Sequence, residues 1–198
     1  PVIRKEDLEL LYEQLDTLKD DDVLVLAGSI PSGMPQSIYR DIMSRLQSKR
    51  IKIAVDATKD LLMNVLAYHP FVIKPNNHEL SEIFDVTIDS KEKAVVYAKE
   101  LQKKGAQNVI VSMAGEGAVF VGSDGSVFTS EAPHGVVKNS VGAGDSMVAG
   151  FLAGYLAKGD YAEAFKMGLC TGSASAFSDQ LATREEVEQV RRSHIFDF

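Results

Sequence analysis

The residues with the clearest chemical potential lie in segment 139–145, which reads NSVGAGD and runs directly into the apolar stretch SMVAGF. A glycine-rich turn before an apolar helical pattern predicts a helix start whose bare N–H groups, at Gly142, Ala143 and Gly144, point the same way. Such a turn binds anions, phosphate above all. Asp145 would repel a bound phosphate, so its placement predicts a base that takes a proton from a hydroxyl attacking phosphorus. The alternative is a glycine-rich turn in which Asp145 is an ordinary N-cap.

A second pair of polar residues, Asn76 and Glu79, lies three positions apart at an expected helix start, within the segment KPNNHE at 74–79. Both side chains can project from the same side of the first helical turn. Amide and carboxylate oxygens are hard ligands suited to Mg²⁺ or to its bound waters. The same spacing also fits a simple capped helix, with Glu79 favoured at the positive end of the helix dipole.

Two further turns follow expected strands. Segment 112–117 reads SMAGEG, in which two glycines two positions apart let a backbone approach a ligand closely and Ser112 adds a hydroxyl. This segment also fits a tight turn that joins two strands. Segment 28–33 reads GSIPSG and is likewise a turn with a hydroxyl, which by itself indicates no particular chemistry.

Short apolar strands that alternate with helices must position these residues. We expect strands at 23–27, 51–55, 71–73, 109–111, 118–121 and 127–129, with the last two joined by a hairpin turn at 123–126. We expect helices at 8–18, 36–48, 60–67, from 79 onward, 91–104, on both sides of a break near 159–160, and at 183–192. This alternation predicts an α/β fold with a mostly parallel sheet flanked by helices, which binds ligands at the carboxyl ends of its strands.

Composition argues against several classes of protein. The chain has 198 residues, 45% of them hydrophobic, and a net charge of −7 with scattered basic residues, which disfavours nucleic-acid binding. No apolar run approaches the length of a membrane span. The single cysteine, Cys170, predicts a buried structural thiol and a reducing, cytoplasmic setting. No linker divides the sequence, so we expect one domain over 1–198.

Taken together, these motifs resemble the PfkB (ribokinase-like) family of carbohydrate kinases. Segment 139–151 is similar to the C-terminal signature of that family, segment 74–79 to its Asn-x-x-Glu motif, and segment 28–33 to its Gly-Ser-x-Pro loop. The three motifs occur in the order typical of the family, and the resemblance extends over essentially the whole chain. It implies a three-layer ribokinase-like fold with a β-hairpin on the C-terminal side, and ATP and Mg²⁺ as cofactors.

The resemblance also implies roles for individual residues. Asp145 is the expected catalytic base, and the amides of Gly142, Ala143 and Gly144 are the expected anion hole. The residues expected to organise Mg²⁺ are Asn76 and Glu79, and those expected at the sugar substrate are Gly28 and Ser29. The residues expected at the nucleotide are Ser112, Met113, Ala114, Gly115, Glu116, Gly117, Gly144, Val137, Ser173 and Lys74. The alternative for Lys74 is a lysine that is merely solvated.

Within the family, segments 55–58, 74–80 and 139–150 are most similar to kinases that convert fructose 1-phosphate and ATP to fructose 1,6-bisphosphate and ADP. The alternatives are a tagatose-6-phosphate kinase, a kinase of another family substrate such as a nucleoside or vitamin, and a nucleotide-binding fragment without catalysis. The resemblance further implies a chain truncated at its N-terminus, with the lid portion missing before Pro1. From this we expect a homodimeric full-length protein and an isolated chain with low or no activity.

Overall fold

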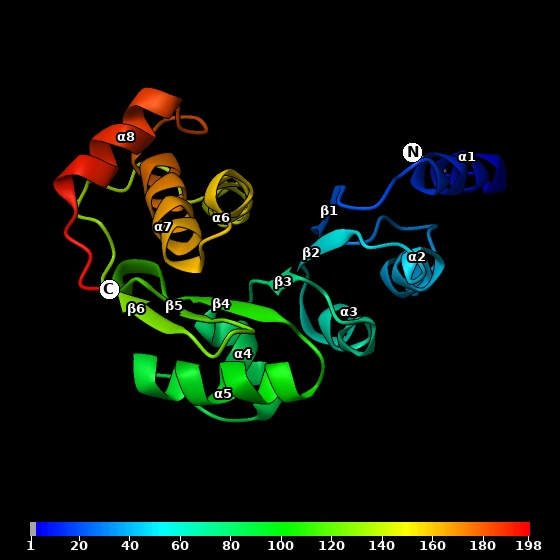
Figure 1. Cartoon of the computed structure of the whole chain (residues 1–198), viewed down its shortest axis with the longest axis horizontal. Coiled ribbons are helices and arrows are strands. Elements are labelled where there is room, and N and C mark those ends of the chain that lie inside the picture. Colours follow the sequence, from blue (N-terminus) through cyan, green and yellow to red (C-terminus); the bar gives the residue numbers. More distant parts are fainter. Residues whose placement is uncertain (1–2) are drawn as a thin grey trace.

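Helices cover both faces of a six-stranded sheet in the computed structural model, which describes residues 3–198 (Figure 1). The strands are β1 (Val23–Ala27), β2 (Lys52–Asp56), β3 (Val72–Ile73), β4 (Asn108–Ser112), β5 (Ala118–Val121) and β6 (Val127–Ser130). They follow one another across the sheet in sequence order. The pairings from β1 to β4 are parallel, and those of β4 with β5 and β5 with β6 are antiparallel. The expected mostly parallel sheet with a hairpin on its C-terminal side is therefore confirmed.

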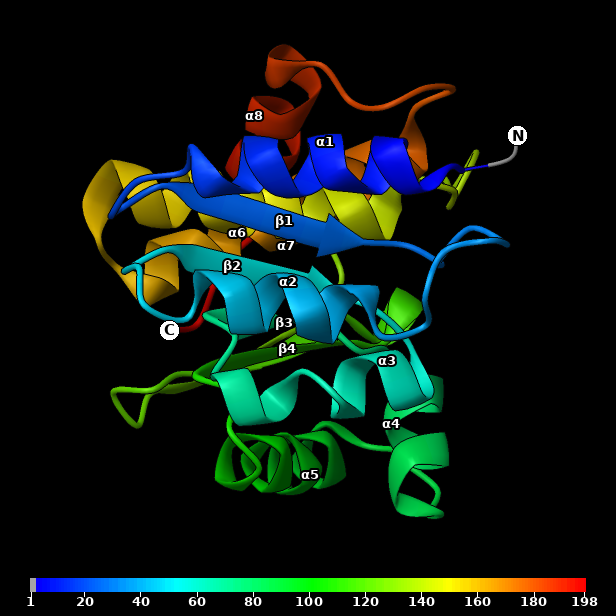
Figure 2. The same ribbon diagram turned by 90° about the vertical axis from the view of Figure 1, so that its right-hand side faces the viewer.

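The helices form two layers, one on each side of the sheet (Figure 2). One layer contains α1 (Lys5–Asp16), α2 (Ile38–Leu46), α3 (Lys59–Met63), α4 (Asn77–Phe84) and α5 (Lys91–Lys103). The other contains α6 (Ala143–Lys158) and α7 (Tyr161–Phe177), with α8 (Arg184–Ser193) packed on α7. Figure 2 shows α1 and α2 in front of β1 and β2, with α6 and α7 behind. None of the helices in the described part of the chain has the length and apolar character needed to cross a membrane.

Strand residues alternate between the two halves of the core, as the two-residue repeat of a β-strand requires. In β2, Ile53 and Val55 belong to the core beneath α1 to α5, whereas Ala54 belongs to the core beneath α6 and α7. In β5, Val119 lies in the first core and Phe120 in the second. Because the central strands are covered on both faces, they read in the sequence as nearly continuous apolar runs.

The helix expected at 60–67 is wrong in its second half. The α-helix α3 ends at Met63, and a separate 3₁₀-helix, η1 (Leu66–Tyr68), follows it. Pro70 cannot donate a backbone hydrogen bond and disfavours a helical conformation at His69, whose φ is 53°. The chain therefore turns tightly here to enter β3. The other expected helices and strands are present with slightly shifted ends, and Thr183 and Glu186 form a capping box at the start of α8.

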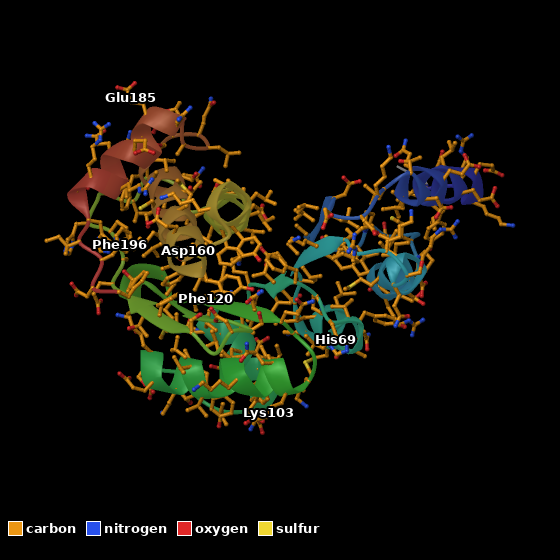
Figure 3. All side chains as sticks on the ribbon, viewed as in Figure 1. His69, Lys103, Phe120, Asp160, Glu185 and Phe196 are labelled. Atoms are coloured by element: carbon orange, nitrogen blue, oxygen red, sulfur yellow. The ribbon has the colours of Figure 1, made fainter. Side chains whose placement is uncertain are left out.

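Phe120 lies at the centre of an aromatic cluster that holds α6 and α7 on the sheet (Figure 3). It is fully buried, and its ring centroid lies 5.4 Å from that of Phe151 on α6 and 5.9 Å from that of Phe165 on α7. The two helices also contact each other closely, because a methyl group added at Gly168 of α7 would lie only 2.9 Å from the Met147 carbonyl oxygen of α6. The position of α6 relative to the sheet is therefore fixed by packing from two sides.

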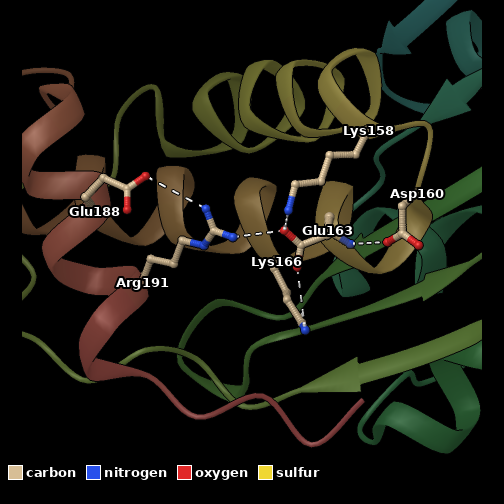
Figure 4. A network of polar contacts seen from close by, with 6 residues as sticks. All are labelled: Lys158, Asp160, Glu163, Lys166, Glu188 and Arg191. Atoms are coloured by element: carbon tan, nitrogen blue, oxygen red, sulfur yellow. Dashed lines mark hydrogen bonds and ion pairs between the residues drawn. The ribbon is translucent and has the colours of Figure 1, made fainter.

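Ion pairs join α6, α7 and α8 at the end of α6 that lies away from segment 139–145 (Figure 4). Glu163 in the first turn of α7 pairs with Lys158 of α6 at 2.6 Å and with Arg191 of α8 at 2.9 Å. The hydrogen bond from Lys158 is the main cause that lowers the pKa of Glu163. Asp160 caps α7 by accepting a hydrogen bond from the Glu163 backbone N–H at 2.7 Å. The network thus fixes the three helices to one another.

We expect Phe120→Ala to lower the free energy of unfolding by about 3–5 kcal/mol, because it removes a fully buried ring and leaves a cavity between three elements. Urea denaturation followed by circular dichroism measures this loss. The control is Val96→Ala on α5, where the side chain is 55% exposed and the expected change is within about 0.5 kcal/mol. Equal midpoints for the two variants would contradict the central position of Phe120.

Candidate active site

A glycine turn starts α6 and places Asp145 in the first turn of the helix. Gly142 occupies the N-cap position with a φ of 80°, a left-handed conformation that glycine adopts without strain. Within residues 3–198, no side chain caps this helix end. The alternative in which Asp145 is the N-cap is therefore wrong. Asp145 is instead the third residue of α6, and it is exposed.

The backbone amides of this turn are only partly used inside the chain. Ser146 donates its N–H to the Gly142 carbonyl at 2.9 Å, and Ala143 donates to the Ser140 carbonyl at 3.2 Å. Across the described residues, the amides of Gly142, Gly144 and Asp145 donate to no protein acceptor. Unpaired amides at the positive end of a 16-residue helix have the chemistry to bind an anion, as predicted for this turn. The predicted role of the Ala143 amide stays a prediction, and that amide is engaged in the turn.

A buried ion pair lies directly beneath this turn. Lys74 follows β3 and Asp56 ends β2, and the Lys74 Nζ lies 3.3 Å from the Asp56 Oδ2. Their side chains are only 8% and 18% exposed, so the alternative in which Lys74 is merely solvated is wrong. A methyl group added at Gly144 would lie 3.1 Å from the Lys74 Nζ and 3.9 Å from the Asp56 Oδ2. The ammonium is therefore next to the predicted anion site.

Asp56 was not among the site residues predicted from the sequence. Two signals were present there: Asp56 comes directly after an apolar strand, as other polar residues do, and it lies in segment 55–58, whose similarity to fructose 1-phosphate kinases was noted without a role for Asp56. Burial raises the pKa of Asp56, the Lys74 ammonium opposes that rise, and the charges of Asp145 and Glu79 add to it. Asp56 and Lys74 are in contact, and Glu79 and Asp145 lie within electrostatic range of Asp56, so we refer to these four residues as the charged cluster.

The structure joins Asn76 and Glu79 in a capping box at the start of α4. The Asn76 Oδ1 accepts the Glu79 backbone N–H at 2.8 Å, and the Glu79 Oε2 accepts the Asn76 backbone N–H at 2.8 Å. The capped-helix alternative is therefore confirmed, whereas the metal role stays a prediction. In the described residues, no group of three or more His, Cys, Asp or Glu side chains forms a ready metal site.

The donor set nevertheless fits a metal that arrives with phosphate. Mg²⁺ keeps several waters and is often held by one or two carboxylates together with substrate phosphates. The second carboxylate oxygen of Glu79 has no partner among the hydrogen bonds of the described residues. The three carboxylates of Asp56, Glu79 and Asp145 also exceed the single charge of Lys74, so a cation would balance the cluster.

Segment 112–117 lies beside this cluster but is also shaped by packing. A parallel β-bridge joins Ser112 to Asn76, so the segment begins next to α4. Met113 is buried in the core, and a methyl group at Gly117 would lie 2.0 Å from the Ser130 carbonyl oxygen, so both residues have structural roles. The remaining residues, which are exposed, are Ala114, Gly115 and Glu116. Their predicted contact with a nucleotide stays a prediction.

The other predicted binding residues lie on two sides of the cluster. Gly28 donates its N–H to the Asp56 carbonyl at 3.0 Å, so the loop with the exposed Ser29 begins at the ion pair. On the opposite side, α7 contacts the turn, because a methyl group at Gly172 would lie 3.0 Å from the Ala143 carbonyl oxygen. Ser173 is the next residue of α7. Val137 is exposed, and the backbone N–H of the following residue, Lys138, donates to the Ala176 carbonyl of α7 at 2.8 Å.

Cys170 does not take part in this site. It is fully buried on α7, and burial raises the pKa of its thiol to about 12. A thiol with so high a pKa is not a nucleophile at neutral pH. The expectation of a buried structural thiol is therefore confirmed.

We expect Asn76→Ala to lower the free energy of unfolding by about 0.5–2 kcal/mol, because it removes the side-chain acceptor that caps α4. Urea denaturation in the absence of Mg²⁺ isolates this effect from any metal binding. The control, Asn76→Asp, keeps an acceptor at the same position and should unfold close to the unmodified chain. An Asn76→Ala variant as stable as the unmodified chain would mean that the capping box contributes nothing.

Comparisons with known proteins agree with this arrangement. The chain is 44% identical to the 1-phosphofructokinase of Bacillus subtilis over 190 residues, which cover 96% of this chain and 62% of that protein. It is 28% identical to the D-tagatose-1-phosphate kinase of Bacillus licheniformis, again over 96% of this chain and 62% of that protein. The chain thus spans 62% of the length of these two relatives.

The fold and the family profile give the same result. The crystal structure of a phosphofructokinase candidate from Staphylococcus aureus matches with a TM-score of 0.92 and 37% identity, over 98% of this chain and 63% of that one. Residues 2–186 match the profile of the pfkB family carbohydrate kinases. With most of its length matched and the glycine turn, Asp145 and the α4 start in place, the chain belongs to the pfkB family of carbohydrate kinases.

Proposed function

We propose that the natural polypeptide that carries this chain is a kinase that converts fructose 1-phosphate and ATP to fructose 1,6-bisphosphate and ADP. One observation supports the proposal: the amides of Gly142 and Gly144 donate to no acceptor within residues 3–198, the Lys74 ammonium lies beneath Gly144, and Asp145 is in the same helical turn. The identity with the 1-phosphofructokinase of Bacillus subtilis supports the choice of acceptor.

Asp145 acts as the general base in the proposed transfer. It accepts the proton of the C6 hydroxyl while a bond forms between that oxygen and the γ-phosphorus of ATP. The bond between the γ-phosphorus and its bridging oxygen breaks, and the electron pair leaves with ADP. The amides of Gly142 and Gly144 and the Lys74 ammonium stabilise the charge on the transferred group, in positions that are fixed before the reaction.

The acceptor and nucleotide are proposed to approach this centre from different sides. The loop at Gly28 and Ser29, whose Gly28 N–H bonds the Asp56 carbonyl, is proposed to contact the sugar. Ser112, Val137 and Ser173 are proposed to contact the nucleotide. Glu79 is proposed to hold waters of Mg²⁺ through its second carboxylate oxygen. When bound, this ion neutralises part of the charge on the ATP phosphates.

Two other functions fit the chain less well. A tagatose phosphate is the second candidate acceptor, and the relative in Bacillus licheniformis favours tagatose 1-phosphate over tagatose 6-phosphate, which was the alternative from the sequence. A chain that only binds nucleotides gains nothing from an exposed carboxylate beside the anion site, because Asp145 would weaken binding. The homodimeric state and cytoplasmic location of the full-length protein stay predictions.

We expect Asp145→Asn to lower kcat by about 10²–10⁴-fold, because the amide has the same shape but cannot accept the proton. The KM for MgATP should change little, because the turn and Lys74 remain. Coupled detection of ADP release with fructose 1-phosphate measures both constants in the natural polypeptide. The matched control is Asp7→Asn, which changes the third residue of α1 and should leave kcat unchanged.

The same assay with a panel of sugar phosphates tests the acceptor. Turnover with fructose 1-phosphate that is lost in Asp145→Asn is the expected result. Turnover with a tagatose phosphate and none with fructose 1-phosphate would overturn the proposed acceptor but not the transfer. Full activity in Asp145→Asn would overturn the role of the base.

A further inference from the structure

The ion pair between Asp56 and Lys74 is a product of strand register. β2 and β3 are parallel neighbours, and Val55 lies opposite Ile73 in their pairing. Asp56 and Lys74 are the next residues along the two strands, so their side chains lie together at the carboxyl edge of the sheet. The Lys74 Nζ and the Asp56 Oδ2 are 3.3 Å apart, and both side chains are mostly buried.

Lys74 has other carboxylates within electrostatic reach of its partner. Asp145 directly follows Gly144, where an added methyl group would lie 3.1 Å from the Lys74 Nζ, and the charges of Asp145 and Glu79 both act on Asp56. A lysine side chain has four rotatable bonds and can turn toward any nearby acid. If Lys74 paired with Asp145, the positive charge would disfavour proton uptake by the base and would leave the anion site.

We propose that Asp56 is a positioning residue, which holds the Lys74 ammonium under Gly144 and keeps it from pairing with Asp145. This inference rests on the proposed function. It assigns Asp56 a role through Lys74 alone, with no contact to substrate. The Gly144 backbone permits the arrangement, because the nearest atoms to an added methyl group there would be the Lys74 Nζ and Cε at 3.1 and 3.3 Å.

If Asp56 acted only through its negative charge, its loss would have a different effect from the loss of a positioning residue. Asp56 is an acid near bound phosphates, so its removal would make the site more positive and would tighten ATP binding. A positioning role predicts instead a loss of kcat, because a displacement of a reacting or stabilising group by about 1 Å can cost about 10²-fold in rate. The balance between kcat and KM therefore distinguishes the two.

The test is a double-mutant cycle in the natural polypeptide, with Asp56→Asn, Lys74→Met and the two changes combined. We expect each single variant to lose about 10²-fold in kcat, with the KM for MgATP in Asp56→Asn within a few-fold of the unmodified value. Because Asp56 acts through Lys74, the combined variant should be no slower than Lys74→Met. Losses that multiply in the combined variant, or an Asp56→Asn variant with unchanged kcat, would overturn the inference.

Further variants separate position from folding. Asp56→Glu keeps a carboxylate for the ammonium and should recover at least about tenfold of the kcat lost in Asp56→Asn. Asp16→Asn removes the partner of Arg45 in the ion pair between α1 and α2 and should leave kcat unchanged. If Asp56→Asn fails to fold because Lys74 is left unpaired, the combined variant, which leaves no unpaired charge, is compared with Lys74→Met. A combined variant more than about tenfold slower would then overturn the inference.

Failure of the proposed function has a different signature. If the unmodified protein turns over no sugar phosphate, the proposed function fails and kcat cannot be compared. The role of Asp56 is then tested by calorimetry, through the ratio of the affinities for ATP and ADP. A lower ratio in Asp56→Asn supports a Lys74 ammonium held at the γ-phosphate, whereas an unchanged ratio overturns it. An active unmodified protein and an equally active Asp56→Asn variant would overturn this inference alone.

Discussion

The start of α6 rests against the carboxyl edge of β2 and β3, and the site depends on this contact. Gly144 has no side chain, so the ammonium of Lys74 lies directly beneath the turn with its free amides. A larger residue at this position would have to displace the ammonium or lift the helix. The helix cannot move easily, because Phe120 and the close packing of α7 hold it on the sheet.

The charges at this edge of the sheet fit a site that binds phosphate better than they fit an interaction that stabilises the fold. A buried ion pair costs much of its attraction in lost hydration, so the pair of Asp56 and Lys74 contributes little to folding by itself. Lys74 offsets only one of the three carboxylates around it, and the cluster keeps a negative excess. In the proposed function, the amides and one ammonium hold a phosphate group, and the remaining acids suit a proton acceptor and a cation.

Sequence patterns predicted a mostly parallel sheet with helices on both faces, the hairpin and the turn at 139–145 because these depend on local signals. Apolar strands, caps and glycines can be recognised from a few neighbouring residues, as the capping box of Asn76 and Glu79 illustrates. The pair of Asp56 and Lys74 could not be predicted in this way, because it depends on which strands are neighbours and on their register. The prediction of one helix at 60–67 was wrong for a related reason. The chain must turn here to enter β3, and Pro70 disfavours a helix before it, although the apolar residues have helical spacing.

The most direct measurement is a crystal structure of the natural polypeptide with Mg²⁺, a non-hydrolysable ATP analogue and fructose 1-phosphate. The γ-phosphate should lie within hydrogen-bond distance of the Gly142 and Gly144 amides and of the Lys74 ammonium, with the C6 hydroxyl next to the carboxylate of Asp145. A γ-phosphate bound away from this turn, or an Asp145 carboxylate that contacts no hydroxyl of the sugar, would contradict the proposed site.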